Sequence, residues 1–144
     1  MVIRFESKRD LTFPLVWGFV FIIYSIIGIT ILYHGGSISD LYVLIAVFLG
    51  LGVLFFAIII TTYYTIGSEM LTCHMLGFKK RIKIQEIRKI ESQTGMYAGL
   101  KMNTAWKGIV IGYGKWDEIL ISPAEPEKFA EALVSLNPAI QINL

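Results

Sequence analysis

The sequence contains two long stretches that lack charged side chains. Arg, Lys, Asp and Glu are absent from residues 11–39 and again from residues 41–68. Hydrophobic residues make up 55% of the 144-residue chain, whereas a typical soluble domain is about 45–50% apolar even when glycine is counted. This composition excludes a fully soluble single domain, and it also excludes a disordered chain.

Cysteine is nearly absent as well. The single thiol, Cys73, excludes an internal disulfide framework and fits a domain kept in a reducing compartment. The net charge of +2 gives no indication of a nucleic-acid partner. No glycine-rich phosphate loop of the Walker or dinucleotide type occurs in the sequence. We therefore expect neither a nucleic-acid partner nor a cofactor.

Each uncharged stretch is long enough to hold a membrane-spanning helix. A bilayer core of about 30 Å requires about 20 apolar residues, and residues 14–33 and 41–61 supply two such runs. The linker between them contains a Gly-Gly pair, which is typical of a turn. The two runs therefore predict a transmembrane α-hairpin. Their length and uniform apolarity disfavour a buried pair of soluble helices, and a cleaved signal peptide has a shorter apolar region of about 7–15 residues.

The flanking charges predict the orientation of this hairpin. Arg4, Lys8 and Arg9 precede the first span, and the linker carries only the acidic Asp40. Further basic residues follow the second span from Lys79 onward. Because positively charged segments stay on the cytoplasmic side, we expect a multi-pass membrane protein with both termini in the cytoplasm.

Composition changes abruptly after Thr61, which predicts a domain boundary between residues 1–61 and residues 62–144. Short apolar or alternating runs separated by turn signals predict strands over residues 63–66, 70–76, 80–84, 87–92, 107–113 and 117–122. Residues 93–104 have no clear period and stay unassigned.

The chain then changes to helical spacing. Phe129, Leu133 and Leu136 recur at i, i+4 and i+7 and form one apolar stripe. Pro126 suits a first helical position, and an Asn-Pro pair at residues 137–138 ends the helix. The whole pattern predicts an antiparallel β-sandwich or barrel followed by one amphipathic C-terminal helix.

Several blocks of this region occur in a characteristic order. They are Tyr64-Thr65-Ile66, Gly77-Phe78-Lys79-Lys80-Arg81-Ile82, Tyr113-Gly114-Lys115-Trp116-Asp117-Glu118-Ile119-Leu120-Ile121-Ser122-Pro123, then Phe129, Leu133 and Asn137-Pro138. In these blocks the sequence resembles the bacterial pleckstrin-homology-like (PH-like) family sometimes called YyaB-like, found in small membrane-anchored proteins. The resemblance implies a PH-like fold and a membrane-associated setting, and it implies no catalytic activity. We expect this membrane to be the bacterial inner membrane.

No catalytic or metal-binding constellation stands out in the sequence. Cys73 and His74 are adjacent on a predicted strand, so they point to opposite faces and do not form a dyad. Asp117 and Glu118 are neighbours in the same way, so they do not form a facing carboxylate pair.

The one feature that suggests a binding partner is a cluster of basic residues in which Glu86 is the only acidic residue. Its members are Lys79, Lys80, Arg81, Lys83, Arg88 and Lys89. Strand alternation places Lys79, Arg81 and Lys83 on one face and Ile82 on the core face with Lys80. The cluster has two interpretations: it binds anionic lipid headgroups, or it only sets topology and solubility.

These observations predict a non-enzymatic, membrane-anchored PH-like interaction module at the cytoplasmic face, which binds a protein partner or anionic lipid headgroups. A small immunity or self-protection protein belongs to the same class. The alternative is a membrane-embedded enzyme or a transport accessory subunit. The lack of acidic and basic residues inside both spans counts against this alternative, because intramembrane chemistry and ion transport rely on such groups.

Overall fold

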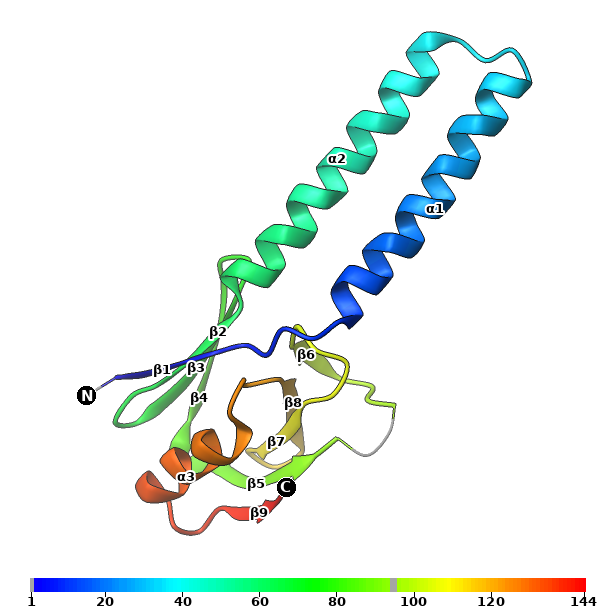
Figure 1. The fold of residues 1–144 in the computed structure, drawn as a ribbon. Helices are drawn as coiled ribbons and strands as arrows, with labels where there is room; N and C mark the ends of the chain where they lie inside the picture. Colours follow the sequence, from blue (N-terminus) through cyan, green and yellow to red (C-terminus); the bar gives the residue numbers. More distant parts are fainter. Residues whose placement is uncertain (1, 94–95) are drawn as a thin grey trace. The chain divides into compact units, whose positions relative to one another are not determined.

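The computed structural model describes residues 2–93 and 96–144. The chain divides into two compact units. One contains residues 11–57, and the other combines the N-terminal segment up to Asp10 with residues 58–144 (Figure 1). This division differs from the predicted one, which placed the N-terminal tail with the two apolar helices.

The helical unit is an antiparallel pair formed by α1 (Thr12–Tyr33) and α2 (Ile38–Thr61). Both helices are long and apolar enough to cross a membrane. The Trp17 ring stacks on Phe48 with 4.8 Å between ring centroids. A Cβ on Gly52 would lie 3.0 Å from the Trp17 ring, so the absence of a side chain there permits this close approach.

The second unit contains two β-sheets. The first sheet has the order β1-β2-β3-β4 and consists of β1 (Ile3–Glu6), β2 (Tyr63–Ile66), β3 (Met70–Met75) and β4 (Phe78–Lys83). The second sheet has the order β6-β8-β7-β5-β9 and consists of β5 (Ile87–Ser92), β6 (Leu100–Met102), β7 (Ile109–Tyr113), β8 (Asp117–Ile121) and β9 (Gln141–Asn143). A 3-10 turn, η1 (Ile84–Glu86), carries the chain from one sheet to the other.

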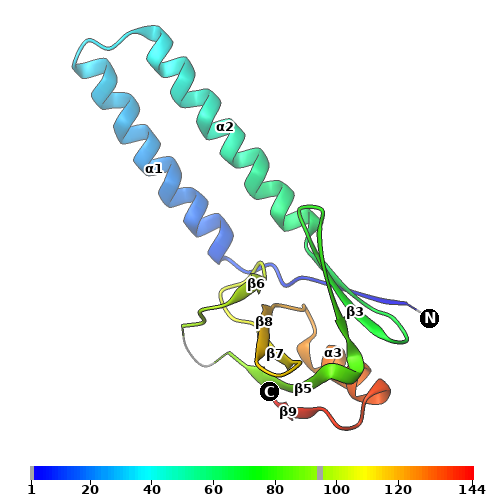
Figure 2. The same cartoon turned by 180° about the vertical axis from the view of Figure 1, so that it is seen from behind.

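The predicted strands are confirmed to within two residues at their ends, but the sheets are not wholly antiparallel. β6 pairs with β8, and β9 pairs with β5, in parallel orientation. β9 lies beside β5 in both views of the fold (Figures 1 and 2). β6 falls within the unassigned residues 93–104, of which 94–95 lie outside the described residues. A strand of three residues is too short to show a period, so the sequence alone did not reveal it.

The N-terminal tail belongs to the first sheet because β1 pairs antiparallel with β2. Its apolar side chain Phe5 packs edge-to-face on Phe129, with ring centroids 5.1 Å apart. Directly after the strand, the buried Ser7 hydroxyl lies 3.0 Å from the Tyr64 hydroxyl and 3.0 Å from the Ser122 hydroxyl. The Thr104 hydroxyl lies 2.7 Å from the same Ser7 oxygen. This buried polar cluster fixes the tail to strands from both sheets.

The core lies between the sheets and α3 (Pro126–Leu136). Phe129 and Leu133 are fully buried, as predicted, whereas Leu136 is 38% exposed and does not complete the predicted stripe. Ala130 of α3 is buried in place of Leu136. The buried Asn137 side chain ends the helix by donating hydrogen bonds to the carbonyl groups of Ile84 at 2.9 Å and Ile87 at 3.3 Å.

Candidate functional site

The outward-facing side chains of the first sheet include four exposed basic residues, Arg4, Lys79, Arg81 and Lys83. The strand register places Arg81 opposite Thr72, Thr72 opposite Thr65, and Thr65 opposite Arg4. The adjacent row runs from Lys79 through His74 and Tyr63 to Glu6. We call this surface the outer face and define it by Arg4, Glu6, Tyr63, Thr65, Thr72, His74, Lys79, Arg81 and Lys83.

Strand β4 supplies three exposed cations to the outer face. Lys79, Arg81 and Lys83 are exposed, while the alternate residue Ile82 is 2% exposed and lies in the core. This is the alternation that the sequence predicts. Lys83 forms an exposed 3.3 Å ion pair with Glu86, whereas Lys79 and Arg81 form no ion pair with any residue in the described ranges 2–93 and 96–144.

A stack of rings and one guanidinium occupies the centre of the outer face. The Arg4 guanidinium lies 4.2 Å from the centroid of the Tyr63 ring, and Tyr63 stacks on His74 at 4.3 Å with an interplanar angle of 10°. Partial burial, together with the positive charges of Lys79, Arg4 and Arg81, lowers the pKa of His74 from its usual value. The lowered pKa favours the neutral imidazole at neutral pH, and it reflects chiefly partial burial and then the positive charges of this surface.

Other residues of β3 and β4 alternate with those of the outer face, and their side chains point toward the core. Burial raises the pKa of the Cys73 thiol to about 12, so no reactive thiolate forms at neutral pH. Lys80 lies opposite Cys73 in the register, and its ammonium is 5.5 Å from the centroid of the Tyr113 ring. Cys73 and His74 point to opposite sides of β3, as predicted. In the described part of the chain, no three His, Cys, Asp or Glu side chains are grouped so that they could hold a metal ion.

The fold separates Arg88 and Lys89 from the other basic residues. Both lie on β5 in the second sheet, because η1 redirects the chain after β4. Arg88 donates a 2.8 Å hydrogen bond to the Lys115 carbonyl. Lys89 pairs with Glu91 at 2.8 Å and with Glu118 at 3.2 Å, and its hydrogen bonds to these two carboxylates raise its pKa.

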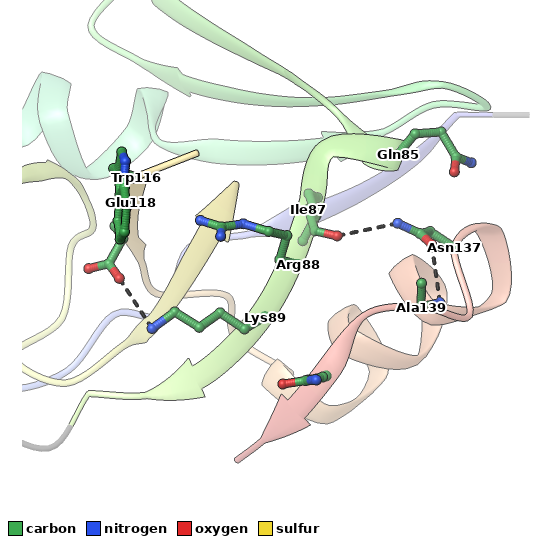
Figure 3. A pocket seen from close by; sticks show the side chains of 9 residues that line it. Gln85, Ile87, Arg88, Lys89, Trp116, Glu118, Asn137 and Ala139 are labelled. Carbon is green, nitrogen blue, oxygen red and sulfur yellow. Dashed lines mark hydrogen bonds and ion pairs between the residues drawn. The ribbon is translucent and has the colours of Figure 1, made fainter. Parts of the chain in front are cut away.

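These two residues line a shallow pocket of about 640 Å³ between β5, the β7–β8 turn and the segment after α3 (Figure 3). Its lining residues also include Trp116, Glu118, Asn137 and Gln141. Figure 3 shows the Lys89 ammonium directed toward the Glu118 carboxylate. The basic cluster of the sequence is thus divided between the two sheets. On the first sheet, Lys79 and Arg81 form no ion pair with a described residue, whereas in the pocket on the second sheet Lys89 pairs with two carboxylates.

A family model described as "Bacterial PH domain" matches residues 62–137, which is more than half of the chain. The chain belongs to the bacterial PH domain family. Comparisons with curated proteins and with solved structures gave no match. The match confirms the predicted resemblance, and the PH domain of this chain includes β2 to β8 and α3. The edge strands β1 and β9 lie outside the match and extend the two sheets on either side.

Sequence reasoning identified only Lys79, Arg81 and Lys83 on the outer face and missed its other members, among them Arg4, Tyr63 and His74. The alternation of Ile3 and Phe5 with Arg4 and Glu6 was a signal for β1, but four residues carry it weakly. The register that brings Arg4 across from Thr65 depends on pairing between residues about 60 positions apart, and local periodicity contains no information on such pairing.

Proposed function

We propose that this protein is a membrane-anchored, non-enzymatic PH-domain module that binds anionic lipid headgroups through its outer face. The setting that we propose is the cytoplasmic leaflet of the bacterial inner membrane. The observation that carries the proposal is the exposed positive charge of Arg4, Lys79 and Arg81 on one side of the first sheet, where none of the three forms an ion pair with a described residue.

The two apolar helices support the membrane setting. Their hydropathies over 18 residues are 2.5 for Pro14–Tyr33 and 3.2 for Ile38–Thr61, and none of the side chains in these windows is buried within the protein. A core helix of a soluble protein would bury one face, so an apolar pair without buried side chains fits a bilayer. The basic residues Arg4, Lys8 and Arg9 before α1 support cytoplasmic termini.

Chain connectivity brings the outer face close to the end of α2. Tyr63 follows the last residue of α2, Thr61, after a single residue, and Lys79 shares its cross-strand row. Arg81 lies two residues further along its strand, about 7 Å away, and Lys83 about 14 Å away. The Debye length is about 8 Å at physiological ionic strength. Lys79 and Arg81 therefore contribute most to attraction by an anionic leaflet, at about 1 kcal/mol each.

The test measures lipid affinity of the full chain in an uncharged detergent, titrated with phosphatidylglycerol or with phosphatidylcholine and followed by native mass spectrometry. We expect preferential retention of phosphatidylglycerol that weakens as salt increases. The double variant Lys79→Gln/Arg81→Gln loses about 2 kcal/mol of this preference, which is about 30-fold in affinity.

The matched control is Arg88→Gln/Lys89→Gln, which removes the same formal charge from the second sheet. It leaves the preference for phosphatidylglycerol in place, because Lys89 is already balanced by two carboxylates. Equal retention of both lipids by the unmodified chain, or equal loss in the two double variants, contradicts the proposal. Equal retention would favour an acidic protein partner for the outer face.

The full chain is required for this experiment. A fragment that starts at residue 62 lacks β1, and with it Arg4 and the buried Ser7 hydroxyl. Its first sheet would end at β2, and the outer face would be incomplete.

A further inference from the structure

The described part of the PH domain has three highly exposed aromatic side chains, Phe78, Trp106 and Trp116. Phe78 begins β4 and is 77% exposed, and Trp106 lies between β6 and β7 and is 73% exposed. The interfacial region of a bilayer favours aromatic rings.

Phe78 is tied to the end of α2. The β3–β4 turn consists of Leu76 and Gly77, with φ angles of 48° and 81°, as a tight hairpin turn with two left-handed residues requires. The Leu76 N–H donates a 2.9 Å hydrogen bond to the hydroxyl of Thr61, the last residue of α2. Phe78 directly follows this turn, so it stays near the level at which α2 ends.

Trp106 is tied in the same way to the start of α1. Its backbone N–H donates a 2.8 Å hydrogen bond to the Asp10 carboxylate, and Asp10 precedes the first residue of α1, Thr12, by two positions. Thr104, two residues before Trp106 in the same loop, donates a 2.9 Å hydrogen bond to the Lys8 carbonyl. The β6–β7 loop is thus fastened along the segment that leads into α1.

Since α1 and α2 form an antiparallel pair, Thr12 and Thr61 lie at the same end of that pair. Both aromatic loops are therefore fastened to chain positions that reach the same leaflet. Basic residues directly follow each ring in sequence, Lys79 after Phe78 and Lys107 after Trp106. An aromatic ring beside a lysine suits the headgroup region, where the ring packs among glycerol and acyl groups and the ammonium meets phosphate.

We propose that Phe78 and Trp106 insert into the headgroup region of the bilayer and dock the PH domain on the membrane at two points. The partner is the lipid surface itself. This proposal rests on the proposed membrane anchoring by α1 and α2, but it does not depend on the preference for anionic lipid.

The test uses the three tryptophans of the chain, Trp17, Trp106 and Trp116. Three variants of the full chain each retain one of them, with the other two replaced by phenylalanine. They are placed in nanodiscs with lipids brominated near the top of the acyl chain and are also exposed to iodide in the water. Trp116 is the matched control, because it is 83% exposed and lies beyond the opposite end of β7 from Trp106, and a strand of five residues spans about 17 Å.

We expect the emission of Trp106 to be blue-shifted, strongly quenched by brominated lipid and weakly quenched by iodide. Trp116 should show the reverse pattern. A Phe78→Trp variant in which all three tryptophans are replaced by phenylalanine should behave as Trp106 does. Iodide quenching of Trp106 as strong as that of Trp116, without quenching by brominated lipid, overturns the docking.

The Trp17 variant separates this failure from failure of the anchoring. If brominated lipid quenches Trp17 but not Trp106, the anchoring stands and the two-point docking is wrong. If brominated lipid quenches neither residue, the anchoring itself fails, and the docking fails with it. Quenching of Trp106 in nanodiscs of phosphatidylcholine alone supports the docking independently of the test for anionic headgroups.

Discussion

The two sheets of the PH domain carry basic residues from one short stretch of sequence, but the side chains that surround these residues differ between the sheets. On the first sheet, Lys79 and Arg81 project from β4 beside threonine, histidine and tyrosine side chains. On the second sheet, Lys89 meets Glu91 and Glu118, and Arg88 binds a carbonyl group. Whether a cation is available to a partner is thus decided by the side chains on neighbouring strands. The local density of lysine and arginine does not decide it.

The largest expected effect concerns the core on which both faces depend. Phe129 is fully buried, and its ring contacts Phe5 edge-to-face at 5.1 Å and Tyr64 at 6.1 Å, both on the first sheet. Phe129→Ala should lower the free energy of unfolding by about 3–5 kcal/mol and disorder the first sheet before the second. Denaturant unfolding of the full chain in micelles measures this loss. Leu136→Ala, on the exposed side of the same helix, should cost less than about 1 kcal/mol, and equal costs would show that α3 is wrongly oriented.

A smaller loss of stability should affect the first sheet more than the second. The Ser7 hydroxyl holds the N-terminal strand by its contacts with Tyr64, Thr104 and Ser122 in a buried cluster. Ser7→Ala should lower stability by about 1–3 kcal/mol, because buried polar partners lose a hydrogen bond. Hydrogen exchange should increase in β1 and β2 more than in β7 and β8. Ser135→Ala, at an exposed hydroxyl, provides the control, and uniform exchange across both sheets would contradict a local role for Ser7.

The smallest effect is a pH dependence confined to the outer face. The pKa of His74 is lowered, chiefly by partial burial and then by Lys79, Arg4 and Arg81. As the pH falls through this lowered pKa, the ring gains a positive charge, which should strengthen binding of phosphatidylglycerol by up to about 1 kcal/mol. His74→Gln should flatten the dependence measured between about pH 7.5 and pH 5. An unchanged dependence in that variant would assign the titration to another group.

The lowered pKa of His74 affects the free energy of unfolding in the direction opposite to its effect on lipid binding. The unfolded chain, with His74 at its usual pKa of about 6.5, binds a proton more readily than the folded chain does. The free energy of unfolding should therefore decrease as the pH falls below about 6.5, until the folded-state pKa is passed. Above that range His74 is neutral in both states and contributes no pH dependence.

The sequence by itself determined the elements whose signals are local. Two long apolar runs specified α1 and α2, because uniform apolarity over about 20 residues needs no knowledge of the rest of the chain. Alternation and turn residues specified six of the strands, and helical spacing specified α3 with Phe129 and Leu133 in the core. The same alternation correctly separated Lys79, Arg81 and Lys83 from the buried Ile82.

Only the tertiary structure decided what depends on residues far apart in the chain. β1, β6 and β9 have three or four residues each, and they form because a partner strand offers a free edge. The division of the basic cluster, the stack of Arg4 on Tyr63, and the ties from Thr61 and Asp10 to the two aromatic loops arise in the same way. The physical reason is that strand register, and the pairing of polar groups far apart in the sequence, depend on which surfaces meet in the folded protein. A local sequence period contains no information on these contacts.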